Sequence, residues 1–495
     1  MEKFACKGLL QLIKSTVLTK KLAIFMLCVF SGTALSAQNK KAKLSVMMQA
    51  YHNYNMFDGA VLVAENGKII YKDAFGLANR EWNIPNRTDT KFMIGSVSKP
   101  LTATLMLIQV QKGLIDLNKP IADYLPEFKN KPAAGITIKQ LLSHTSGMAN
   151  YDIIKDFFPK ISRQNFTRED YVKVFMDSAL VFKSGTSYAY SSWGYFTLGY
   201  IMERVTGKQY AALMKEDIFD KLQMNNSGSY QHLQIVPNRA TGYDYSFGGF
   251  TSADFRDQSN TMGTGDIYST VEDLFKFHLA IQNNTLLNKE LTNEMLSEGM
   301  RPARYGYGWF NQNFKYTPTD SVTANFHLGM TEGFISFMLR MPATNSFTII
   351  LCNSSPTDFF GITKNLMKVL NNKPVELKQP LHKKMETYIA QLGAAKAVEA
   401  YKKMKTDSAH YYVDWISMNF IAEQLLNLKR YEDAKIITEN NAAEFPDKDL
   451  VMFTTGNIYL ALNRKEDAIK FYKKTLQFYP GYQEATNKLK ELEGK

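Results

Sequence analysis

Short runs of apolar residues flank a turn signal near the start of the chain. Residues 60–64 read Ala-Val-Leu-Val-Ala, residues 68–71 read Lys-Ile-Ile-Tyr, and Asn66-Gly67 lies between them. An Asn-Gly pair favours the left-handed backbone that a two-residue hairpin turn requires. The pattern therefore predicts a β-hairpin over residues 58–77.

A second pair of apolar runs lies far along the chain. Residues 334–341 and 347–352 are almost entirely apolar, and the segment 342–346 between them is rich in turn-forming residues. The sequence between the two hairpins is mostly helical with long loops. Strands at both ends of a domain with helices between them predict an α+β fold, with an antiparallel sheet flanked by helices and a further all-helical region.

One helix in this domain is predicted to be buried. Residues 101–110 are apolar on nearly every side, and Gly113 follows as a plausible helix stop. Ser96 lies just before this helix and Lys99 lies in its first turn. Pro100 is tolerated there because the first N–H groups of a helix have no partner within it.

The pattern changes around residues 371–382, which hold two prolines, two asparagines and few apolar residues. We place a linker there, between a domain over residues 38–370 and an all-helical region over residues 383–495.

The helical region carries an internal repeat of 34 residues. Arg430–Ala434 matches Arg464–Ala468, and Phe445-Pro446 matches Tyr479-Pro480. A helix–turn–helix repeat with a small alanine at the packing position and a terminal proline resembles the tetratricopeptide repeat (TPR) family. Two interpretations stay open: a protein-binding groove, or a short helical cap packed on the preceding domain.

The first 37 residues have the pattern of a secretory signal peptide. Lys20-Lys21 precede the short apolar run 22–30, and small residues follow as far as Ala37, after which we expect cleavage. No later stretch reaches the ~18 apolar residues that a spanning helix needs, so we expect no stable membrane span in the mature chain. We expect an exported protein of the bacterial periplasm, with secretion or an uncleaved N-terminal anchor as the alternatives.

Composition and charge exclude several classes of protein. With 45% hydrophobic and 21% charged residues, the chain has the composition of an ordinary globular protein. Its 495 residues are too many for a single hydrophobic core, so we expect more than one domain. The net charge is +12, of which the predicted signal contributes +4 through five lysines and one glutamate. The remaining lysines are scattered among acidic residues, so we expect no nucleic-acid partner.

The segment Ser96-Val97-Ser98-Lys99 is an S-x-x-K motif. A serine hydroxyl becomes a good nucleophile only when a nearby base takes its proton, and three residues along a helix let Ser96 and Lys99 touch. Lysine is such a base only if burial or a neighbouring cation lowers its pKa. The apolar helix provides the burial, and its start directs free N–H groups toward developing negative charge.

Two further segments offer partners for this pair. In Tyr190-Ser191-Ser192 the phenol can relay a proton. In His327-Leu328-Gly329-Met330 the glycine permits close approach of a substrate backbone, and the N–H of Met330 can bind an oxyanion together with that of Ser96. Taken singly, each element is also explained by packing.

Together, in order and spacing, the three elements resemble the active-site motifs of the class C β-lactamase-like serine hydrolases. This penicillin-binding-protein-like, CubicO-type family also includes D-aminopeptidases, D,D-carboxypeptidases and family VIII esterases. Residues 141–147, 268–274 and 305–309 are similar to further stretches of the family, and the resemblance covers roughly residues 45–370. It implies a β-lactamase/transpeptidase-like domain, followed here by a TPR-like module.

By this resemblance, Ser96 forms the acyl-enzyme, and Lys99 and Tyr190 carry protons to and from it. His327 orients Tyr190 or contacts a substrate carboxylate. His144 lies in a motif of the family but supports the site structurally. The oxyanion and substrate-binding set comprises Ser96, Met330, Ser192 and Gly329.

Two departures from the family pattern bear on the substrate. Ser192 stands where asparagine is usual, which weakens an amide contact by ~1–3 kcal/mol if a buried partner goes unpaired. His327 stands where lysine is usual, so a fixed positive charge becomes mostly neutral at pH 7. Both changes point away from efficient β-lactam hydrolysis.

The sequence therefore predicts a serine hydrolase that acts through an acyl-serine on esters, D-amino-acid amides or peptides, or β-lactam-like substrates in the cell envelope. We expect no cofactor and no metal, since the chain has no metal-ligand spacing, phosphate loop or G-x-S-x-G motif. The expected partners are a small-molecule or peptide substrate and, through the TPR-like tail, a protein. The alternative is a catalytically weak or inactive penicillin-binding-like protein with a TPR interaction module, which Ser192 favours.

Overall fold

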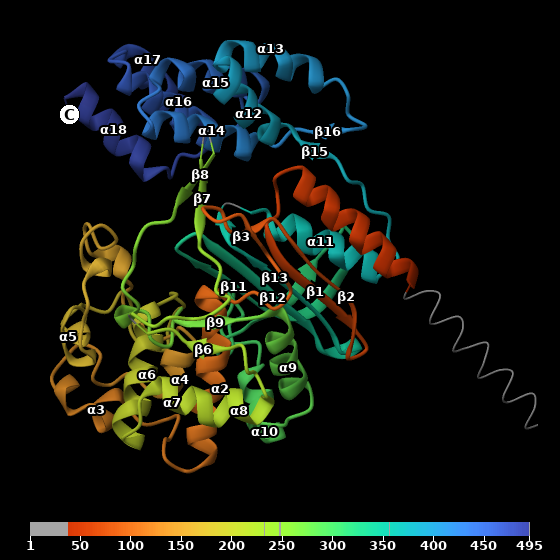
Figure 1. The fold of residues 1–495 in the computed structure, drawn as a ribbon. Coiled ribbons are helices and arrows are strands. Elements are labelled where there is room, and N and C mark those ends of the chain that lie inside the picture. The colour runs from red at the N-terminus through yellow and green to blue at the C-terminus, as the bar shows by residue number, and fades with distance from the viewer. Residues whose placement is uncertain (1–37, 232, 247–248, 356, 495) are drawn as a thin grey trace, which may run out of the picture.

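The computed structural model describes residues 38–494 apart from 232, 247–248 and 356. The expected signal peptide lies outside the described residues. The described chain forms a body, made of a sheet and a helical region, and an all-helical module above it (Figure 1).

The body is built on a six-stranded antiparallel sheet in which the two predicted hairpins meet. The β1–β2 hairpin turns at Asn66 and Gly67, both with positive φ (52° and 71°), as predicted. β1 pairs with β13 of the second hairpin, with Leu62 opposite Ile349. In sheet order the strands are β10 (Phe310–Lys315), β11 (Ser321–Thr331), β12 (Phe334–Met341), β13 (Ser346–Cys352), β1 (Gly59–Glu65) and β2 (Lys68–Phe75).

Both faces of the sheet are buried, which explains why residues 60–64 are apolar without alternation. Ala60, Leu62 and Ala64 belong to the core shared with the helical region. Val61 and Val63, which point the other way, belong to a second core. This second face is covered by a helix over residues 38–53 and by α11 (Phe359–Leu370), which lie together along the right-hand side of the sheet (Figure 1).

The helical region surrounds α2 (Ser98–Gln111), which contains the predicted helix over residues 101–110. Its residues 98–109 are all buried, and Gly113, with φ of 74°, follows its end. The other helices of this region are α3 (Ile121–Tyr124), α4 (Ile138–Leu142), α5 (Arg168–Lys173), α6 (Ser192–Thr206), α7 (Tyr210–Met214), α8 (Asp220–Leu222), α9 (Val271–Gln282) and α10 (Lys289–Met295).

Three small sheets connect these parts. In one of them β5 (Phe92–Met93) pairs with β9 (Ile267–Ser269), which in turn pairs with β6 (Gly228–Ser229). This pairing holds the segment before residue 267 against the turn that carries Ser96. The others are β3 (Leu77–Asn79) with β4 (Ile84–Pro85), and β14 (Ser354–Ser355) with β7 (Tyr243–Ser246) and β8 (Gly249–Ser252).

The all-helical module begins earlier than expected. Residues 371–378 form no helix or strand, but Gln379–Pro380 (β15) pair with Tyr411–Tyr412 (β16), and α12 starts at Leu381, inside the expected linker. The module has core clusters of its own. Its helices are α12 (Leu381–Leu392), α13 (Ala394–Met404), α14 (Trp415–Asn427), α15 (Tyr431–Glu444), α16 (Asp449–Ala461), α17 (Lys465–Phe478) and α18 (Gln483–Glu493).

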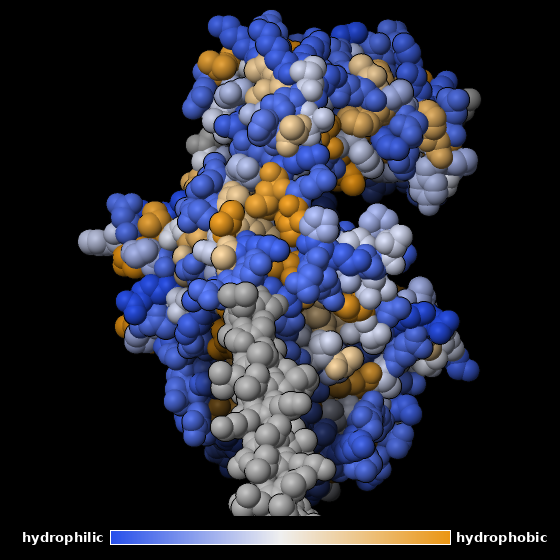
Figure 2. Space-filling view, turned by 90° about the vertical axis from the view of Figure 1, so that its right-hand side faces the viewer, coloured by the Kyte–Doolittle hydropathy of each residue, from blue (hydrophilic) through white to orange (hydrophobic). Residues whose placement is uncertain are grey.

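The module and the body form separate masses. In a view from the side, hydrophilic residues dominate the surface and a notch divides the two on one side (Figure 2). The β7–β8 hairpin points from the body toward α14 (Figure 1), and the ammonium of Lys383 in α12 lies 4.8 Å from the ring centre of Tyr245 in β7. In the described part of the chain, no helix is long and apolar enough to cross a membrane.

Candidate active site

Ser96 and Lys99 come together at the start of α2. Ser96 lies in the 3₁₀ turn Gly95–Val97 that precedes the helix and is partly exposed, whereas Lys99, in the first turn of α2, is fully buried. The Nζ of Lys99 donates a hydrogen bond to Ser96 Oγ at 3.1 Å and another to the carbonyl of Thr264 at 3.0 Å. The structure thus brings the two predicted residues into direct contact.

The surroundings of Lys99 disfavour its charged form. Burial lowers the pKa of Lys99 well below its ordinary value, and the positive charge of Arg256 lowers it further, while Asp266 acts in the opposite direction. A neutral amine can accept a proton from Ser96, which a lysine with an ordinary pKa cannot do at neutral pH.

Tyr190 joins this pair from the segment just before α6. The Nζ of Lys99 lies 4.8 Å from the centre of the Tyr190 ring. Burial raises the pKa of Tyr190 well above its ordinary value, and a hydrogen bond with Ser96 only partly offsets this effect. At neutral pH the residue is therefore a phenol rather than a phenolate.

His327 lies on β11 behind this group and is neutral. Its Nδ1 is 2.7 Å from the carbonyl oxygen of Leu328, which can only accept, so Nδ1 carries the proton and Nε2 accepts from the hydroxyl of Tyr305 at 2.9 Å. Burial and the charge of Lys99 lower the pKa of His327 to about 3. With both nitrogens engaged, His327 orients Tyr305 and contacts Tyr190 only ring to ring, with centres 6.3 Å apart.

His144 lies directly beside Tyr190, a position that its sequence motif does not indicate. It is buried, with a positive φ of 55°, and its ring centre is 4.3 Å from that of Tyr190. Its Nδ1 accepts a hydrogen bond from the backbone N–H of Ser191 at 3.2 Å. The supporting role expected for this loop thus takes a definite form, since His144 fixes the backbone next to Tyr190.

Met330 and Gly329 bring the edge of β11 to the serine. An added Cβ at Gly95 would lie 2.8 Å from the backbone nitrogen of Met330, and one at Gly329 would lie 2.0 Å from the carbonyl oxygen of Ile94. The backbone nitrogens of Ser96 and Met330 therefore lie on segments in close contact. Gly329 is needed for close approach to the protein's own backbone, whereas the sequence suggested approach to a substrate.

Ser192 begins α6 and is nearly buried. Its backbone N–H donates to Oδ1 of Asn150 at 3.0 Å, and the hydroxyl of Ser191 donates to the carbonyl of Ala149 at 2.8 Å. The asparagine that the family pattern has at position 192 is absent, but an asparagine amide from another segment lies beside that position. Sequence reasoning missed Asn150, because it lies three residues beyond the family-like stretch 141–147 and belongs to no motif itself.

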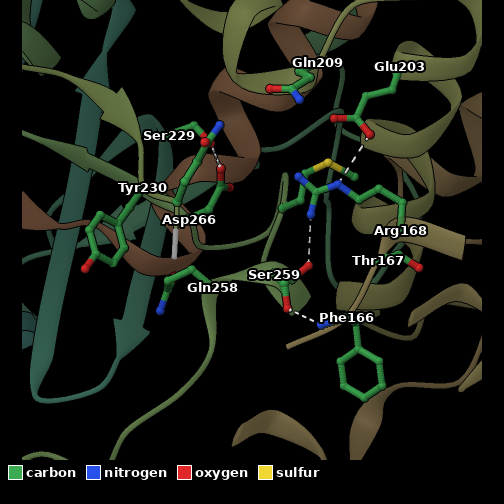
Figure 3. A pocket seen from close by; sticks show the side chains of 12 residues that line it. Phe166, Thr167, Arg168, Glu203, Gln209, Ser229, Tyr230, Gln258, Ser259 and Asp266 are labelled. Carbon is green, nitrogen blue, oxygen red and sulfur yellow. Dashed lines mark hydrogen bonds and ion pairs between the residues drawn. The ribbon is translucent and has the colours of Figure 1, made fainter. Parts of the chain in front are cut away.

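The segment around Thr264 also lines a polar cavity of about 380 Å³. In this cavity Arg168 pairs with Glu203 and donates to the carbonyl of Ser259, and Ser229 donates to Asp266 (Figure 3). Burial raises the pKa of Asp266 to about 6. Because none of Ser96, Lys99 and Tyr190 lines it, the cavity is separate from the candidate site.

Within the described ranges, no group of three or more histidine, cysteine, aspartate or glutamate residues is arranged to hold a metal ion.

A partly exposed serine that is hydrogen-bonded to a buried lysine at the head of a central helix, beside the edge of an antiparallel sheet, is an arrangement that suits a serine hydrolase. The Beta-lactamase family model matches residues 44–370, and the chain belongs to this family. The match ends where α11 ends.

Individual relatives agree with this assignment. Penicillin-binding protein 4* of Bacillus subtilis is 28% identical over 374 residues, which cover 70% of this chain and 80% of that protein. Teichoic acid D-alanine hydrolase of Staphylococcus aureus is 30% identical over 276 residues, covering 55% and 67%.

Solved structures share the fold. FmtA from Staphylococcus aureus matches with a TM-score of 0.57 and 25% identity, over 68% of this chain and 88% of that one. D-amino acid amidase from Ochrobactrum anthropi has the same fold, with a TM-score of 0.56 and 22% identity over 67% and 99% of the two chains.

Proposed function

We propose that Ser96 is the nucleophile of this hydrolase and that Lys99 is the base that activates it. The observation that carries the proposal is the 3.1 Å hydrogen bond between Lys99 Nζ and Ser96 Oγ in a fully buried setting. Burial keeps a fraction of Lys99 neutral, so its nitrogen takes the proton of Ser96 as Oγ attacks the substrate carbonyl.

Tyr190 completes the proton path in this proposal. The neutral phenol of Tyr190 donates its proton to the leaving group and regains one from Lys99. At the end of acylation Ser96 is acylated, and Lys99 and Tyr190 are back in their starting protonation states for the reaction with water. Water then reverses the sequence and releases the acid. The N–H groups of Ser96 and Met330 hold the oxyanion in both steps.

The substrates we propose are esters and amides of D-amino acids in the cell envelope. This choice is supported by the name of the teichoic acid D-alanine hydrolase, at 30% identity, and by a neutral His327 where β-lactamases carry a lysine. A fixed cation at that position would serve the carboxylate of a penicillin, and a buried neutral imidazole does not supply one.

A fluorophosphonate probe and intact-protein mass measurement test the nucleophile. The wild-type protein should gain one phosphonyl group and Ser96→Ala none. Ser98→Ala is the matched control, since Ser98 is fully buried and accepts a hydrogen bond from the N–H of Ile267 at 3.3 Å. Labelling of Ser96→Ala at the wild-type rate, or no labelling of the wild type, would refute the proposal.

Turnover separates the enzyme from the rival function, a ligand-binding protein of low activity. We expect steady hydrolysis of p-nitrophenyl esters and D-alanyl amides, and slow turnover of a chromogenic cephalosporin. Binding of these compounds without turnover by wild-type protein would favour the rival.

We also propose that the helical module is a TPR-like array that binds a protein. Its support is the recurrence of a helix pair, because α14 and α15 begin at Trp415 and Tyr431 and α16 and α17 begin at Asp449 and Lys465, 34 residues later in each case. The segment 381–494, produced alone, should give a helical circular dichroism spectrum and a cooperative melt. An unfolded segment would contradict an independent array.

We propose export to the periplasm with cleavage after Ala37, on the basis of the signal pattern in residues 1–37. Mature protein recovered from a periplasmic extract should begin at Gln38, and an intact residue 1 would indicate an uncleaved anchor.

A further inference from the structure

Arg256 holds a positive charge on a cluster of aromatic rings. The carbon of its guanidinium lies 5.7 Å from the ring centre of Tyr151, 6.0 Å from that of Phe157 and 5.9 Å from that of Phe158. Contacts of this kind hold a guanidinium in place without neutralising it. Arg256 is partly exposed, and Phe158 is 54% exposed, so the cluster opens to solvent.

One connection in the chain links this aromatic cluster to the segment that carries Tyr190. Tyr151 directly follows Asn150, whose side chain accepts the backbone N–H of Ser192 at 3.0 Å. Ser192 begins the helix that follows Tyr190 in sequence. Tyr151, whose ring contacts Arg256, is therefore the direct neighbour of Asn150, whose amide contacts the segment that carries Tyr190.

A second connection reaches the lysine. The Nε of Arg256 donates to Oδ1 of Asn260 at 3.0 Å. Asn260 belongs to the loop that runs to Thr264, and the carbonyl of Thr264 accepts the hydrogen bond from Lys99 at 3.0 Å. The charge of Arg256 lowers the pKa of Lys99, which agrees with this proximity.

Arg256 also differs from Arg163 and Arg168 in its ion pairing. Arg163 forms an ion pair with Asp254, and Arg168 forms one with Glu203. Among the residues that the structure describes, no carboxylate lies within ion-pair distance of the Arg256 guanidinium. A partly buried cation without a counter-ion is costly, and a site that binds an anion recovers that cost when the ligand arrives.

We propose that Arg256 binds a negatively charged group on the substrate, a carboxylate or a phosphate, and makes the anionic members among the proposed esters and amides the preferred substrates of this hydrolase. The inference rests on the proposed function of Ser96 and names its substrate class. With His327 neutral, the cation that recognises the substrate's anion then comes from the loop before Asn260 rather than from β11.

The test compares two p-nitrophenyl esters that differ only in charge: the half-ester of adipic acid and its methyl-capped diester. We expect the wild-type protein to have the higher kcat/KM for the half-ester. In Arg256→Gln the ratio of the two values should fall about tenfold to a hundredfold, because a hydrogen bond to a charged group is lost. Arg256→Lys should recover part of the ratio.

Arg239→Gln is the matched control. Arg239 is exposed and lies 4.3 Å from the ring centre of Tyr230, a similar cation–π contact outside the catalytic group. The ratio should keep its wild-type value in this variant. A third ester, with a phosphonate in place of the carboxylate of the half-ester, shows which anion is preferred; a higher kcat/KM than the neutral diester for either anion supports the proposal.

The proposal is overturned if wild-type protein does not prefer either anion, or if Arg256→Gln lowers kcat/KM equally for charged and neutral esters, which would mean that Arg256 only holds the aromatic loop. Failure of the proposed function gives a different result, namely no hydrolysis of any ester and no fluorophosphonate adduct on Ser96.

Discussion

Replacing Gly329 by alanine tests how β11 is held against the turn that carries Ser96, the proposed nucleophile. The added methyl group would lie 2.0 Å from the carbonyl oxygen of Ile94 and 2.3 Å from the Oγ of Ser336. That hydroxyl donates to the carbonyl of Ile94 at 2.7 Å and so ties β12 to the turn that carries Ser96. The methyl group therefore cannot enter unless the strand moves away and this hydrogen bond breaks.

The size of the effect follows from these contacts. Loss of a buried hydrogen bond costs about 1–3 kcal/mol of unfolding free energy, and overpacking costs a further ~1–3 kcal/mol. We expect a total of roughly 2–6 kcal/mol. If β11 moves by about 1 Å, the N–H of Met330 no longer faces the oxyanion of the proposed mechanism, and acylation should slow on the order of a hundredfold.

Urea unfolding measures the first effect, and the rate of fluorophosphonate labelling measures the second. Gly135→Ala is the control, because Gly135 is exposed and an added Cβ there meets nothing within 4 Å. A Gly329→Ala variant with the wild-type unfolding midpoint and labelling rate would show that β11 does not press on the turn, and the reasoning would be wrong.

Three further predictions concern other parts of the molecule. His144→Ala should slow Ser96 labelling and cost ~1–3 kcal/mol of stability, because the N–H of Ser191 loses its acceptor; His144→Asn, which keeps an acceptor, should restore part of both, and unchanged labelling would contradict the role. Stability should fall as pH drops below 6.5, because buried His278 and His327, with pKa values of about 3, take up protons only on unfolding. At pH 5 each of the two histidines should lower the free energy of unfolding by ~2 kcal/mol. Equal urea midpoints at pH 7 and pH 5 would refute this prediction. A chain that ends at residue 378 should keep the labelling rate of the full chain, since the module has its own cores, and loss of labelling in a folded truncated protein would tell against this.

Local sequence patterns were enough to predict much of the fold. The hairpin at Asn66-Gly67 and the buried helix after Ser96 could be predicted because each depends on neighbouring residues. The S-x-x-K contact follows from helix geometry in the same way. The family resemblance then connected this motif with Tyr190 and the strand edge at Met330.

Other site residues could not be found in this way, because tertiary packing of loops brings them to the site. Asn150, Thr264 and Arg256 come from irregular segments and belong to none of the motifs found in the sequence. Tyr305 belonged to a family-like stretch, but its bond to His327 depends on how β11 lies beside the loop before β10. Position in space, rather than residue type, marks these residues.

The link between Arg256 and Lys99 makes a final prediction about pH. The charge of Arg256 lowers the pKa of Lys99, and Asp266 opposes it. An anionic substrate bound at Arg256 offsets that positive charge, so the pKa of Lys99 should rise in the enzyme–substrate complex. Because kcat/KM reports the free enzyme and kcat reports the complex, the acidic limb of kcat should lie at higher pH than that of kcat/KM for the adipate half-ester. For the neutral diester the two limbs should coincide. Coincident limbs for both esters would mean that the bound anion does not change the pKa of Lys99. Arg256 would then act independently of Ser96, Lys99 and Tyr190.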